Sequence, residues 1–367
     1  MSLPTSLRNR LGPLAASAFL FSACVHDDEK TAPALPDPAY LFSVTSDYKT
    51  GSYAAYGLTS GTVLPDIDVI HSDVAVRFHG GSDIFVINRL GRDNLAVVDK
   101  NNLKVVLAVK FPSLSNPQDV EAKDGLLYVS FLAYDSILVF DQASGNQVGG
   151  IDIHAYADSD GFAEAGALAF AGNDLYAVMQ NLDTKDPMLK PHADPKLLKI
   201  DVQKRAVDKA FTLPLSNPQG ITYDAAKGML YVPCVGEYTD ESYQPKLDGG
   251  IVAVDPASGE ATVLATEADL GGNVGRLVLN DGKLIFDLGM PAADRVEAFS
   301  LSDESVTPIV DLNPYAGGGL AVDAGTNTLC VGDRKKGLRL FALDTFKEKD
   351  ATAISLGLPP VDMVVVR

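Results

Sequence analysis

Asn116-Pro117-Gln118-Asp119-Val120 returns further along the chain as Asn217-Pro218-Gln219-Gly220-Ile221. Each stretch is followed by a glycine-containing turn and then by an apolar strand, at residues 125–129 and 228–232. Units of this kind recur about every 43 to 56 residues, and repeats of that length built from short strands are typical of a β-propeller. The sequence therefore predicts a ring of four-stranded blades.

Six complete units can be placed between residues 74 and 344. Their innermost strands are expected at residues 74–78, 119–122, 167–170, 220–223, 276–279 and 319–322. Their second strands are expected at residues 83–88, 126–131, 174–180, 229–235, 283–288 and 328–333. Third strands are recognised by an apolar run that ends at Asp99, Asp141, Asp201, Asp255 or Asp344. Aspartate suits the polar turn that follows, because its side chain accepts hydrogen bonds from turn N–H groups.

Two incomplete pieces remain at the ends of this region. Residues 361–366 read as an innermost strand with nothing after it, and residues 40–45, 52–58 and 62–67 read as three outer strands with none before them. Joined, the pieces make a seventh blade that both ends of the chain share, which removes the open edge of the ring. We therefore expect one all-β domain over residues 40–367, a seven-bladed β-propeller closed by pairing of its N- and C-terminal segments.

A family resemblance rests on the repeated pattern of an apolar strand, an Asn/Asp-rich loop and a strand ending in Asp. The stretch Asn88-Arg89-Leu90-Gly91-Arg92-Asp93-Asn94-Leu95-Ala96-Val97-Val98-Asp99 carries it best and resembles the YVTN and NHL-type propeller repeats of secreted bacterial proteins. The resemblance covers about residues 40–367 and implies the fold. It does not imply an activity, because propellers host hydrolases, lyases, electron-transfer proteins and binding proteins.

Composition narrows the functional classes. The formal net charge is −18, which opposes a phosphate backbone and argues against nucleic acid as a partner. The acidity serves solubility or attracts cations and basic ligands. The chain has no Trp, which argues against the WD, kelch, sialidase Asp-box and Trp-docked quinoprotein propellers. It has no Cys-x-x-Cys-His motif, so a covalent c-type haem is excluded.

The first residues read as a secretory signal, with Arg8 and Arg10 before an apolar run that is too short to span a bilayer. Phe21-Ser22-Ala23-Cys24 then resembles a bacterial lipobox. We expect residues 1–23 to be a lipoprotein signal peptide, Cys24 to carry the acyl chains (palmitate among them), and residues 24–39 to form a flexible tether. The alternative is an ordinary signal peptide with a coincidental Cys.

Val25 after Cys24 favours, by resemblance to Gram-negative sorting, an outer-membrane lipoprotein that faces the periplasm or the exterior. The lipid anchor at Cys24 would then make the membrane a partner of the protein. The other two cysteines, Cys234 and Cys330, fall in apolar strands of blades that are not neighbours. We expect them to be buried and unpaired, because a disulfide needs Cα atoms within about 7 Å.

Two connections between second and third strands are long, at residues 181–195 and 236–245, and belong to adjacent blades. In a propeller they share a face with the loop that holds Asp160 and Glu164, and Glu164 would lie near the channel mouth. We expect an acidic, tyrosine-bearing patch over blades 3 and 4 that binds a cation, a basic peptide or a sugar; tolerated surface loops are the alternative. The candidate ligand-binding residues are Asn116, Gln118, Asp160, Glu164, Asn181, His192, Asn217, Gln219, Glu237 and Tyr238. For the Asn and Gln residues that recur, turn chemistry is the competing interpretation.

Two functions follow from these features. The first is a binding or scaffold module in the envelope that contacts an envelope protein or a small ligand, with no catalytic residue, no nucleic acid and no metal site. The second is a metal-dependent hydrolase or lyase. The resemblance to gluconolactonase-like propellers, which hold a central divalent cation with Glu, Asn and Asp, would assign Glu164, Asn116 and Asn217 to that site. That family has six blades rather than the seven expected here. We therefore expect no cofactor, with a divalent cation as the alternative.

Overall fold

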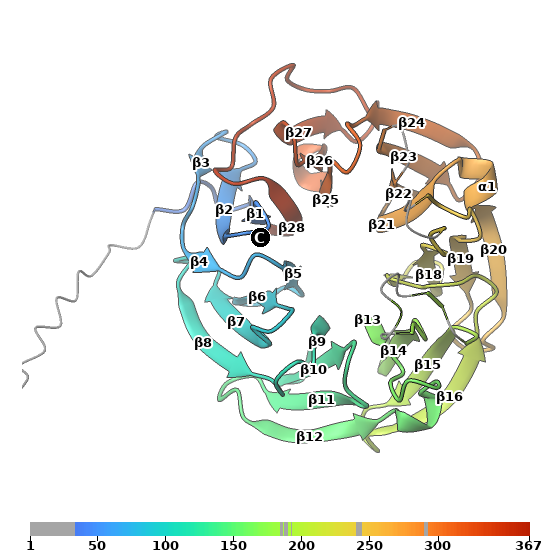
Figure 1. Cartoon of the computed structure of the whole chain (residues 1–367). Helices are drawn as coiled ribbons and strands as arrows, with labels where there is room; N and C mark the ends of the chain where they lie inside the picture. Colours follow the sequence, from blue (N-terminus) through green and yellow to red (C-terminus); the bar gives the residue numbers. More distant parts are fainter. Residues whose placement is uncertain (1–33, 184–185, 187–189, 192, 240–243, 290–292) are drawn as a thin grey trace, which may run out of the picture. The chain divides into compact units, whose positions relative to one another are not determined.

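The computed structural model describes residues 34–183, 186, 190–191, 193–239, 244–289 and 293–367. The predicted signal peptide, Cys24 and His192 lie outside the described residues. The described part is a ring of antiparallel sheets around a central channel, with the first strand of each repeat nearest the channel (Figure 1). The seven-bladed propeller is confirmed.

The strands follow the chain blade by blade. Blade 1 contains β5 (Val74–Phe78), β6 (Asp83–Asn88), β7 (Asn94–Asp99) and β8 (Val105–Lys110). Blade 2 contains β9 (Pro117–Lys123), β10 (Leu126–Phe131), β11 (Ser136–Asp141) and β12 (Gln147–Asp152). Blade 3 contains β13 (Ala165–Ala171), β14 (Asp174–Met179), β15 (Lys196–Asp201) and β16 (Ala206–Thr212). Blade 4 contains β17 (Thr222–Asp224), β18 (Met229–Cys234), β19 (Gly250–Val254) and β20 (Ala261–Thr266).

Blade 5 contains β21 (Asn273–Asn280), β22 (Lys283–Gly289), β23 (Arg295–Ser300) and β24 (Val306–Asp311), and it is preceded by the short helix α1 (Glu267–Leu270). Blade 6 contains β25 (Gly317–Asp323), β26 (Thr328–Asp333) and β27 (Gly337–Ala342). Blade 7 contains β28 (Pro360–Val366), β1 (Tyr40–Ser46), β2 (Gly51–Gly57), β3 (Val63–Leu64) and β4 (Val69–Ile70). Two short 3-10 turns complete the elements, at His154–Tyr156 and Ala324–Thr326.

Two blades depart from the regular four strands. In blade 6 the outermost position is filled by isolated bridges, Leu338 to Ile354 and Phe341 to Glu348. In blade 7 the predicted outer strand at residues 62–67 is reduced to β3, and β4 follows beyond the predicted range; the two pair with opposite halves of β2. Elsewhere the predicted first and second strands agree with the structure within a few residues.

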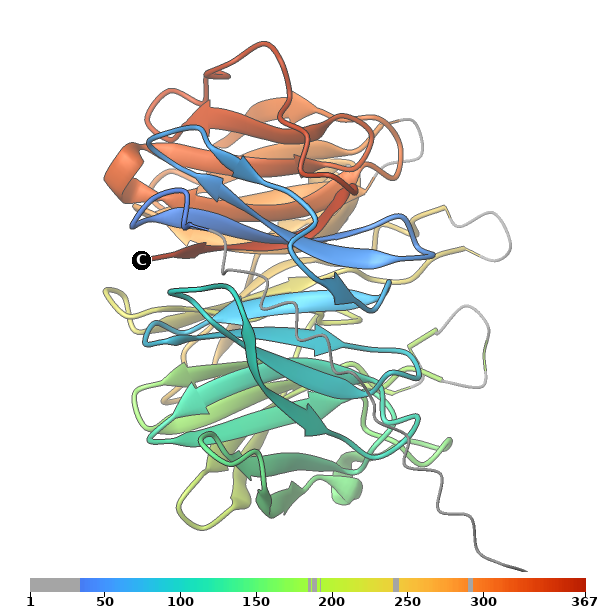
Figure 2. The same cartoon turned by 90° about the vertical axis from the view of Figure 1, so that its left-hand side faces the viewer.

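Ring closure is formed by β28 and β1, which lie side by side in Figures 1 and 2 and pair antiparallel from Tyr40 opposite Val366. The folded part begins before Tyr40. Leu35 packs against the core, and a carboxylate oxygen of Asp37 accepts the backbone N–H groups of Thr59 at 2.8 Å and of Ser60 at 2.9 Å. The last residues of the predicted tether are therefore attached to blade 7.

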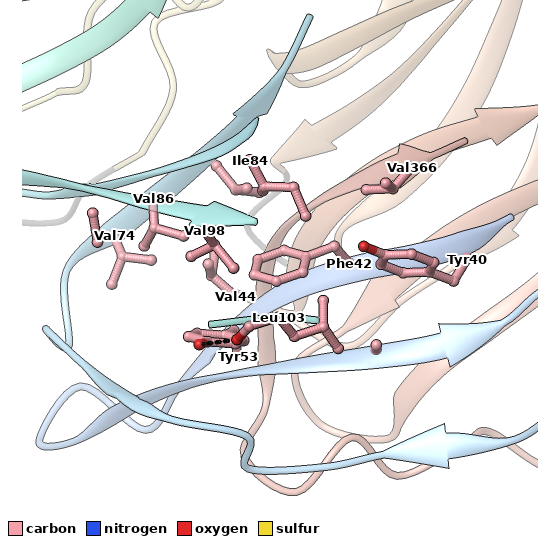
Figure 3. Packing of buried hydrophobic residues seen from close by; sticks show 13 residues of the cluster. Tyr40, Phe42, Val44, Tyr53, Val74, Ile84, Val86, Val98, Leu103 and Val366 are labelled. Atoms are coloured by element: carbon pink, nitrogen blue, oxygen red, sulfur yellow. Dashed lines mark hydrogen bonds between the residues drawn. The ribbon is translucent and has the colours of Figure 1, made fainter. Parts of the chain in front are cut away.

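The core is divided among the interfaces between blades, because each sheet buries both faces against its neighbours. Figure 3 shows the cluster between blades 7 and 1, in which Phe42 stacks on Tyr53 with ring centroids 4.9 Å apart. The hydroxyl of Tyr53 donates to the carbonyl of Leu103 at 2.8 Å, so this buried polar group is satisfied. Cys234 and Cys330 are buried and unpaired, as predicted. Within the described residues, no helix has the length and apolar character needed to cross a membrane.

Candidate functional site at the channel mouth

The central channel holds a cavity of about 630 Å³ lined by the innermost strands. A chain of ion pairs crosses it. The guanidinium of Arg77 in blade 1 lies 2.6 Å from Asp119 of blade 2 and 3.1 Å from Asp362 of blade 7. Arg276 of blade 5 approaches the same Asp362 carboxylate at 3.4 Å. Four charged side chains from four blades therefore meet inside the ring.

Both carboxylates of this network also bind backbone. Asp119 accepts the N–H of Leu168 in blade 3 at 2.8 Å, and Asp362 accepts the N–H of Val76 in blade 1 at 3.1 Å. Each therefore joins its own blade to the next. Burial lowers the pKa of Arg77, but the charges of Asp119 and Asp362 raise it by more. The net pKa lies above its ordinary value, so the guanidinium stays charged. We interpret the network as part of the architecture of the ring.

A second cavity of about 270 Å³ opens beside the channel, and we call it the mouth pocket. Gln219, Gly275 and Asp287 line both cavities, so the two are adjacent. The mouth pocket lies over blades 4 to 7, on the face formed by the connections between second and third strands and between successive blades. Its polar and aromatic wall is formed by Tyr48, Gln219, Tyr238, Asn273, Asp287, Asp294, Tyr315 and Arg334.

Arg334 and Tyr48 form one side of the mouth pocket. The Arg334 guanidinium lies 4.1 Å from the centre of the Tyr48 ring, a cation–π contact between blades 6 and 7. None of the described carboxylates forms an ion pair with Arg334, which is partly buried. Burial, with the charge of Arg276 nearby, lowers the pKa of Arg334 relative to its ordinary value. A guanidinium in this position has its planar face packed against the tyrosine, whose side chain also forms a hydrogen bond with it.

Two of the tyrosines are held in an unusual backbone conformation. Tyr48 has φ of 68° and Tyr315 has φ of 57°, the left-handed region that bulky residues seldom adopt. The two residues are 73% and 71% exposed, and Leu90 and Leu114, in loops outside the mouth pocket, combine positive φ with comparable exposure. Such strain costs about 1–3 kcal/mol and persists where the surrounding tight loop imposes it. The two loops present aromatic rings to solvent at the rim of the mouth pocket.

Deeper in the wall, Asp287 and Asn273 carry oxygens without hydrogen-bond donors. Asp287 Oδ1 and Asn273 Oδ1 are buried and have no partner among the described residues, although Asn273 Nδ2 donates to the Val235 carbonyl at 2.6 Å. Burial raises the pKa of Asp287, and the nearby Arg276 opposes this rise. A Cβ at Gly275 would lie 2.2 Å from Asp287 Oδ1, so glycine is required there for the carboxyl group to fit.

The recurring Asn and Gln residues divide into two groups. Asn116 and Asn217 adopt left-handed backbone conformations before the innermost strands, with φ of 51° and 55°. The side chain of Asn217 accepts from Gln180 Nε2 at 2.7 Å and donates to the Gly236 carbonyl at 3.1 Å, and Gln118 donates to Asn116. These contacts favour the turn interpretation for Asn116 and Asn217. Gln219 is exposed and lines both cavities, and Gln118 lines the channel.

Glu164 does not face the channel. It is fully buried, its Oε2 accepts the N–H of Leu182 at 3.1 Å, and its Oε1 has no donor. Burial, followed by the charges of Asp160 and Asp158, raises the pKa of Glu164 to about 9, so it is neutral at pH 7. Asn181 is also buried, with its Nδ2 donating to the Tyr156 carbonyl at 3.0 Å. The structure thus places Glu164 under a loop of blade 3, separate from the side chains of Asn116 and Asn217.

The remaining predicted residues lie in blade 4. Tyr238 lines the mouth pocket, whereas Glu237 is paired with Lys246. Of the predicted residues, Gln219 and Tyr238 are therefore the two that the mouth pocket brings together. Tyr48, Asp287, Tyr315 and Arg334 were missed, because they come from short loops or a buried strand of blades 5 to 7. Among the described residues, no group of three His, Cys, Asp or Glu side chains is placed to hold a metal ion.

Comparison with known proteins supports the propeller fold and assigns no activity. No family model matches the chain, and no curated protein matches it in sequence. A candidate 6-phosphogluconolactonase from Bacteroides fragilis is similar over 91% of this chain and 100% of its own, at 14% identity and a TM-score of 0.64. AztD from Citrobacter koseri is similar over 89% of this chain and 97% of its own, at 14% identity and a TM-score of 0.58.

Hydrazine synthase from Kuenenia stuttgartiensis is similar over 75% of this chain and 79% of its own, at 16% identity and a TM-score of 0.56. At such identities the likeness shows the propeller fold alone, and a propeller fits a binding or scaffold module. The YVTN and NHL-type resemblance stays a prediction.

Proposed function

We propose that this protein is an envelope lipoprotein whose propeller binds a small ligand in the mouth pocket. The observation that carries the proposal is the convergence of Tyr48, Tyr238 and Tyr315, from three separate loops, on one cavity. Tyrosine offers a rigid apolar face and a polar hydroxyl, which is the combination that ligand sites use. The lipid at Cys24 would hold the protein at the membrane.

The exposure of Tyr48 and Tyr315 supports a binding role. Folding alone gains little from these aromatic rings, since neither residue is buried. A ligand that packs between the rings would supply the missing burial. The volume of about 270 Å³ lies just below the roughly 300–1,000 Å³ of sites for drug-sized molecules. The pocket therefore suits a compact ligand, about the size of one monosaccharide or amino acid.

The proposal is tested by filling the mouth pocket. Gly289 lines it, has no positive φ, and a Cβ there would meet its nearest atom at 3.9 Å, so Gly289→Trp adds bulk without backbone strain. Because the chain has no Trp, the new indole also reports on the pocket by fluorescence. The control is Arg92→Trp, at an exposed loop position of blade 1 outside the pocket.

Melting curves of the three proteins would be recorded against a panel of sugars, sugar acids, amino acids and nucleotides. A ligand that binds the folded state raises the melting temperature by mass action. We expect at least one compound to raise it for the wild type and for Arg92→Trp but not for Gly289→Trp. A panel that stabilises none of the proteins, or all three equally, would overturn binding in the mouth pocket.

A metal-dependent hydrolase or lyase is the second candidate. The observation that favours it is the buried Glu164, which lies beside Asp158 and Asp160 and has one oxygen without a donor. Metal analysis of the purified protein tests it: equimolar calcium or zinc that is lost in Glu164→Ala would support this function. Protein without stoichiometric metal, prepared without chelators, would exclude it.

A further inference from the structure

The face of the ring that bears the mouth pocket, which we call the loop face, is divided by charge. It is formed by the connections between second and third strands and between successive blades. Its basic half, over blades 6, 7 and 1, carries Lys49, Arg89, Arg92, Arg334, Lys335 and Lys336. Its acidic half, over blades 3 and 4 and the connections that border them, carries Asp160, Asp183, Asp186, Asp194, Asp248 and Asp269.

Opposite charges within each half do not remove this division. On the basic half, Asp73 neutralises Arg89, to which it is paired at 2.6 Å. On the acidic half, Lys246 is paired with Glu237. The other cations of the basic half outnumber its exposed carboxylates, which are Asp47 and Asp68. In a chain whose net charge is −18, cations gathered on one side of one face indicate a contact with an acidic surface.

The two halves also differ in the length of their loops. Over blades 3 and 4, the connections between second and third strands are long, at residues 180–195 and 235–249. Over blades 6, 7 and 1 the same connections are short, at residues 334–336, 47–50 and 89–93. The long acidic connections of one molecule can therefore lie over the short basic connections of another.

Exposed apolar side chains gather on the same face. Tyr48, Leu90, Leu114 and Tyr315 are between 64% and 74% exposed and lie in its short connections. The other large apolar residues that are exposed in the described part of the chain are valines of outer strands. Exposed apolar side chains concentrated on one face are typical of an interaction surface.

The basic and acidic halves lie opposite one another across the channel. In a ring of seven blades, blade 7 faces the junction of blades 3 and 4, as Figure 1 shows. The boundary between the halves runs from the connection before blade 6, which holds Tyr315, to the connection before blade 2, which holds Leu114. A two-fold axis along this boundary places the basic half of each molecule on the acidic half of the other. Residues beside such an axis contact their own counterparts, so the two exposed apolar side chains each meet an identical one.

We propose that the protein forms an isologous dimer through the loop face, with a second copy of the chain as the partner. Blade 6 of each molecule then lies over the acidic connections of blade 4 of the other, so that Lys335 and Lys336 face Asp248 and Asp269. Two molecules of charge −18 repel at a distance, and the opposite charges at the contact select this orientation.

The dimer goes beyond the proposed function, because it controls access to the mouth pocket. Face-to-face association covers the mouth pockets of both molecules. A ligand then enters the mouth pocket in the monomer and is enclosed between the two molecules in the dimer.

The test exchanges the charges of the two halves. One variant combines Lys335→Glu with Lys336→Glu, and the other combines Asp248→Lys with Asp269→Lys; all four side chains are exposed. In a dimer of either variant, like charges face each other at both contacts. In a mixed dimer of the two variants, opposite charges face each other at both contacts again.

The matched control combines Lys104→Glu with Lys227→Glu, which makes the same change of charge at exposed lysines on the opposite face. Every sample also carries Cys24→Ala, so that no acyl chain contributes to association. Sedimentation velocity over the micromolar to millimolar range measures the monomer–dimer equilibrium, and circular dichroism melting curves establish that each variant is folded.

We expect the parent protein and the control to dimerise alike, and each charge-exchanged variant to dimerise about 10-fold more weakly or not at all. An equimolar mixture of the two variants should recover the dimer. A parent protein that stays monomeric would overturn the dimer and leave the proposed function standing, since the pocket-filling experiment tests that function separately. Dimers that neither variant weakens would overturn the role of the loop face. Weakened variants whose mixture recovers nothing would overturn the two-fold arrangement.

Discussion

The carboxylate of Asp362 accepts a hydrogen bond at 3.1 Å from the backbone N–H of Val76, which lies 286 residues earlier in the chain. The same carboxylate faces Arg77 and Arg276. One side chain in the last strand thus connects blade 7 with blade 1 and with blade 5. The closure of the ring depends on β28, which is the last strand of the chain.

Deleting residues 360–367 should therefore prevent cooperative folding. The deletion removes the buried side chains of Val361, Met363 and Val366, each worth about 1.5–3 kcal/mol, and it leaves the edge of β1 unpaired. The sum approaches the total stability of a typical domain, which is about 5–15 kcal/mol. Urea unfolding followed by circular dichroism measures the effect. Deletion of Arg367 alone measures the part due to its ion pair with Asp323, and an unchanged midpoint for the longer deletion would contradict the closure.

Asp362→Asn should destabilise the protein by about 1–3 kcal/mol at neutral pH. The amide keeps the shape but leaves Arg276 without its carboxylate and Arg77 with Asp119 alone, and both arginines are partly exposed, which moderates the loss. Urea unfolding at pH 7 checks this value. A variant as stable as the wild type would show that the ion pairs contribute nothing to closure.

The same variant should change the acid limb of the stability curve. Burial alone would raise the pKa of Asp362. The two guanidinium groups and the backbone N–H groups lower it by more than this rise, so the net pKa lies below the ordinary value. Such a group stabilises the fold above its unfolded pKa of about 4, and the contribution is lost as the pH falls through its folded value. The difference between wild type and Asp362→Asn should therefore shrink between pH 5 and pH 3.

Strand positions could be predicted because each blade repeats a local pattern. Second strands such as β6 and β10 combine an apolar run with a preceding turn, and their predicted bounds agree with the structure. The third strand of blade 5, β23, was missed because it ends in Ser300 rather than in the Asp that marks the other blades. Closure was predictable since the two incomplete ends complement one another.

The mouth pocket could be predicted only in part. Gln219 and Tyr238 stood out because one recurs in the repeat and the other lies in a long loop. Arg334 and Tyr48 lie in short connections of blades 6 and 7, which the sequence separates by nearly the whole propeller, and only the closed ring brings them to 4.1 Å. Asp287 lies inside the apolar strand β22, and from such a pattern we expect residues of the hydrophobic core rather than of a binding site.

Cys24→Ala should release the protein from the membrane. If Cys24 carries the acyl chains, the substitution removes the only anchor that the sequence predicts, and several chains together are needed for stable attachment. Cell fractionation and intact-protein mass spectrometry measure the outcome. Cys234→Ala, at a buried unpaired thiol, is the control for loss of a cysteine elsewhere. A Cys24→Ala protein that stays in the membrane fraction with no loss of lipid mass would contradict the lipoprotein interpretation.

Asn217→Ala should cost about 2–4 kcal/mol of stability. It removes the hydrogen bonds to Gln180 and Gly236, leaves both groups unpaired in a buried region, and places alanine on left-handed backbone. Asn217→Gly should recover about 1 kcal/mol, because glycine adopts this conformation without strain. Urea unfolding of both variants separates the two terms. If Asn217→Ala is as stable as the wild type but loses ligand binding, the turn interpretation is wrong and Asn217 belongs to a binding site.

Glu164→Gln should make the protein more stable than the wild type in alkaline solution. Burial and the nearby Asp160 and Asp158 raise the pKa of Glu164 from about 4.5 to about 9, so the folded state holds a proton that the unfolded state releases. The stability conferred by this carboxyl is complete below pH 4.5 and is lost as the pH rises through 9. Glutamine imitates the protonated form, since it offers both an acceptor for the Leu182 N–H and a donor.

The unfolding free energies of wild type and Glu164→Gln should therefore agree at pH 4.5 and differ by on the order of 2 kcal/mol or more at pH 8.5. Glu260→Gln is the matched control, because Glu260 is exposed and its replacement changes only the surface charge. Urea titrations at the two pH values measure each difference. A parallel pH dependence for wild type and Glu164→Gln would mean that Glu164 is ionised in the folded protein, which requires a cation beside it and would favour the metal-dependent function.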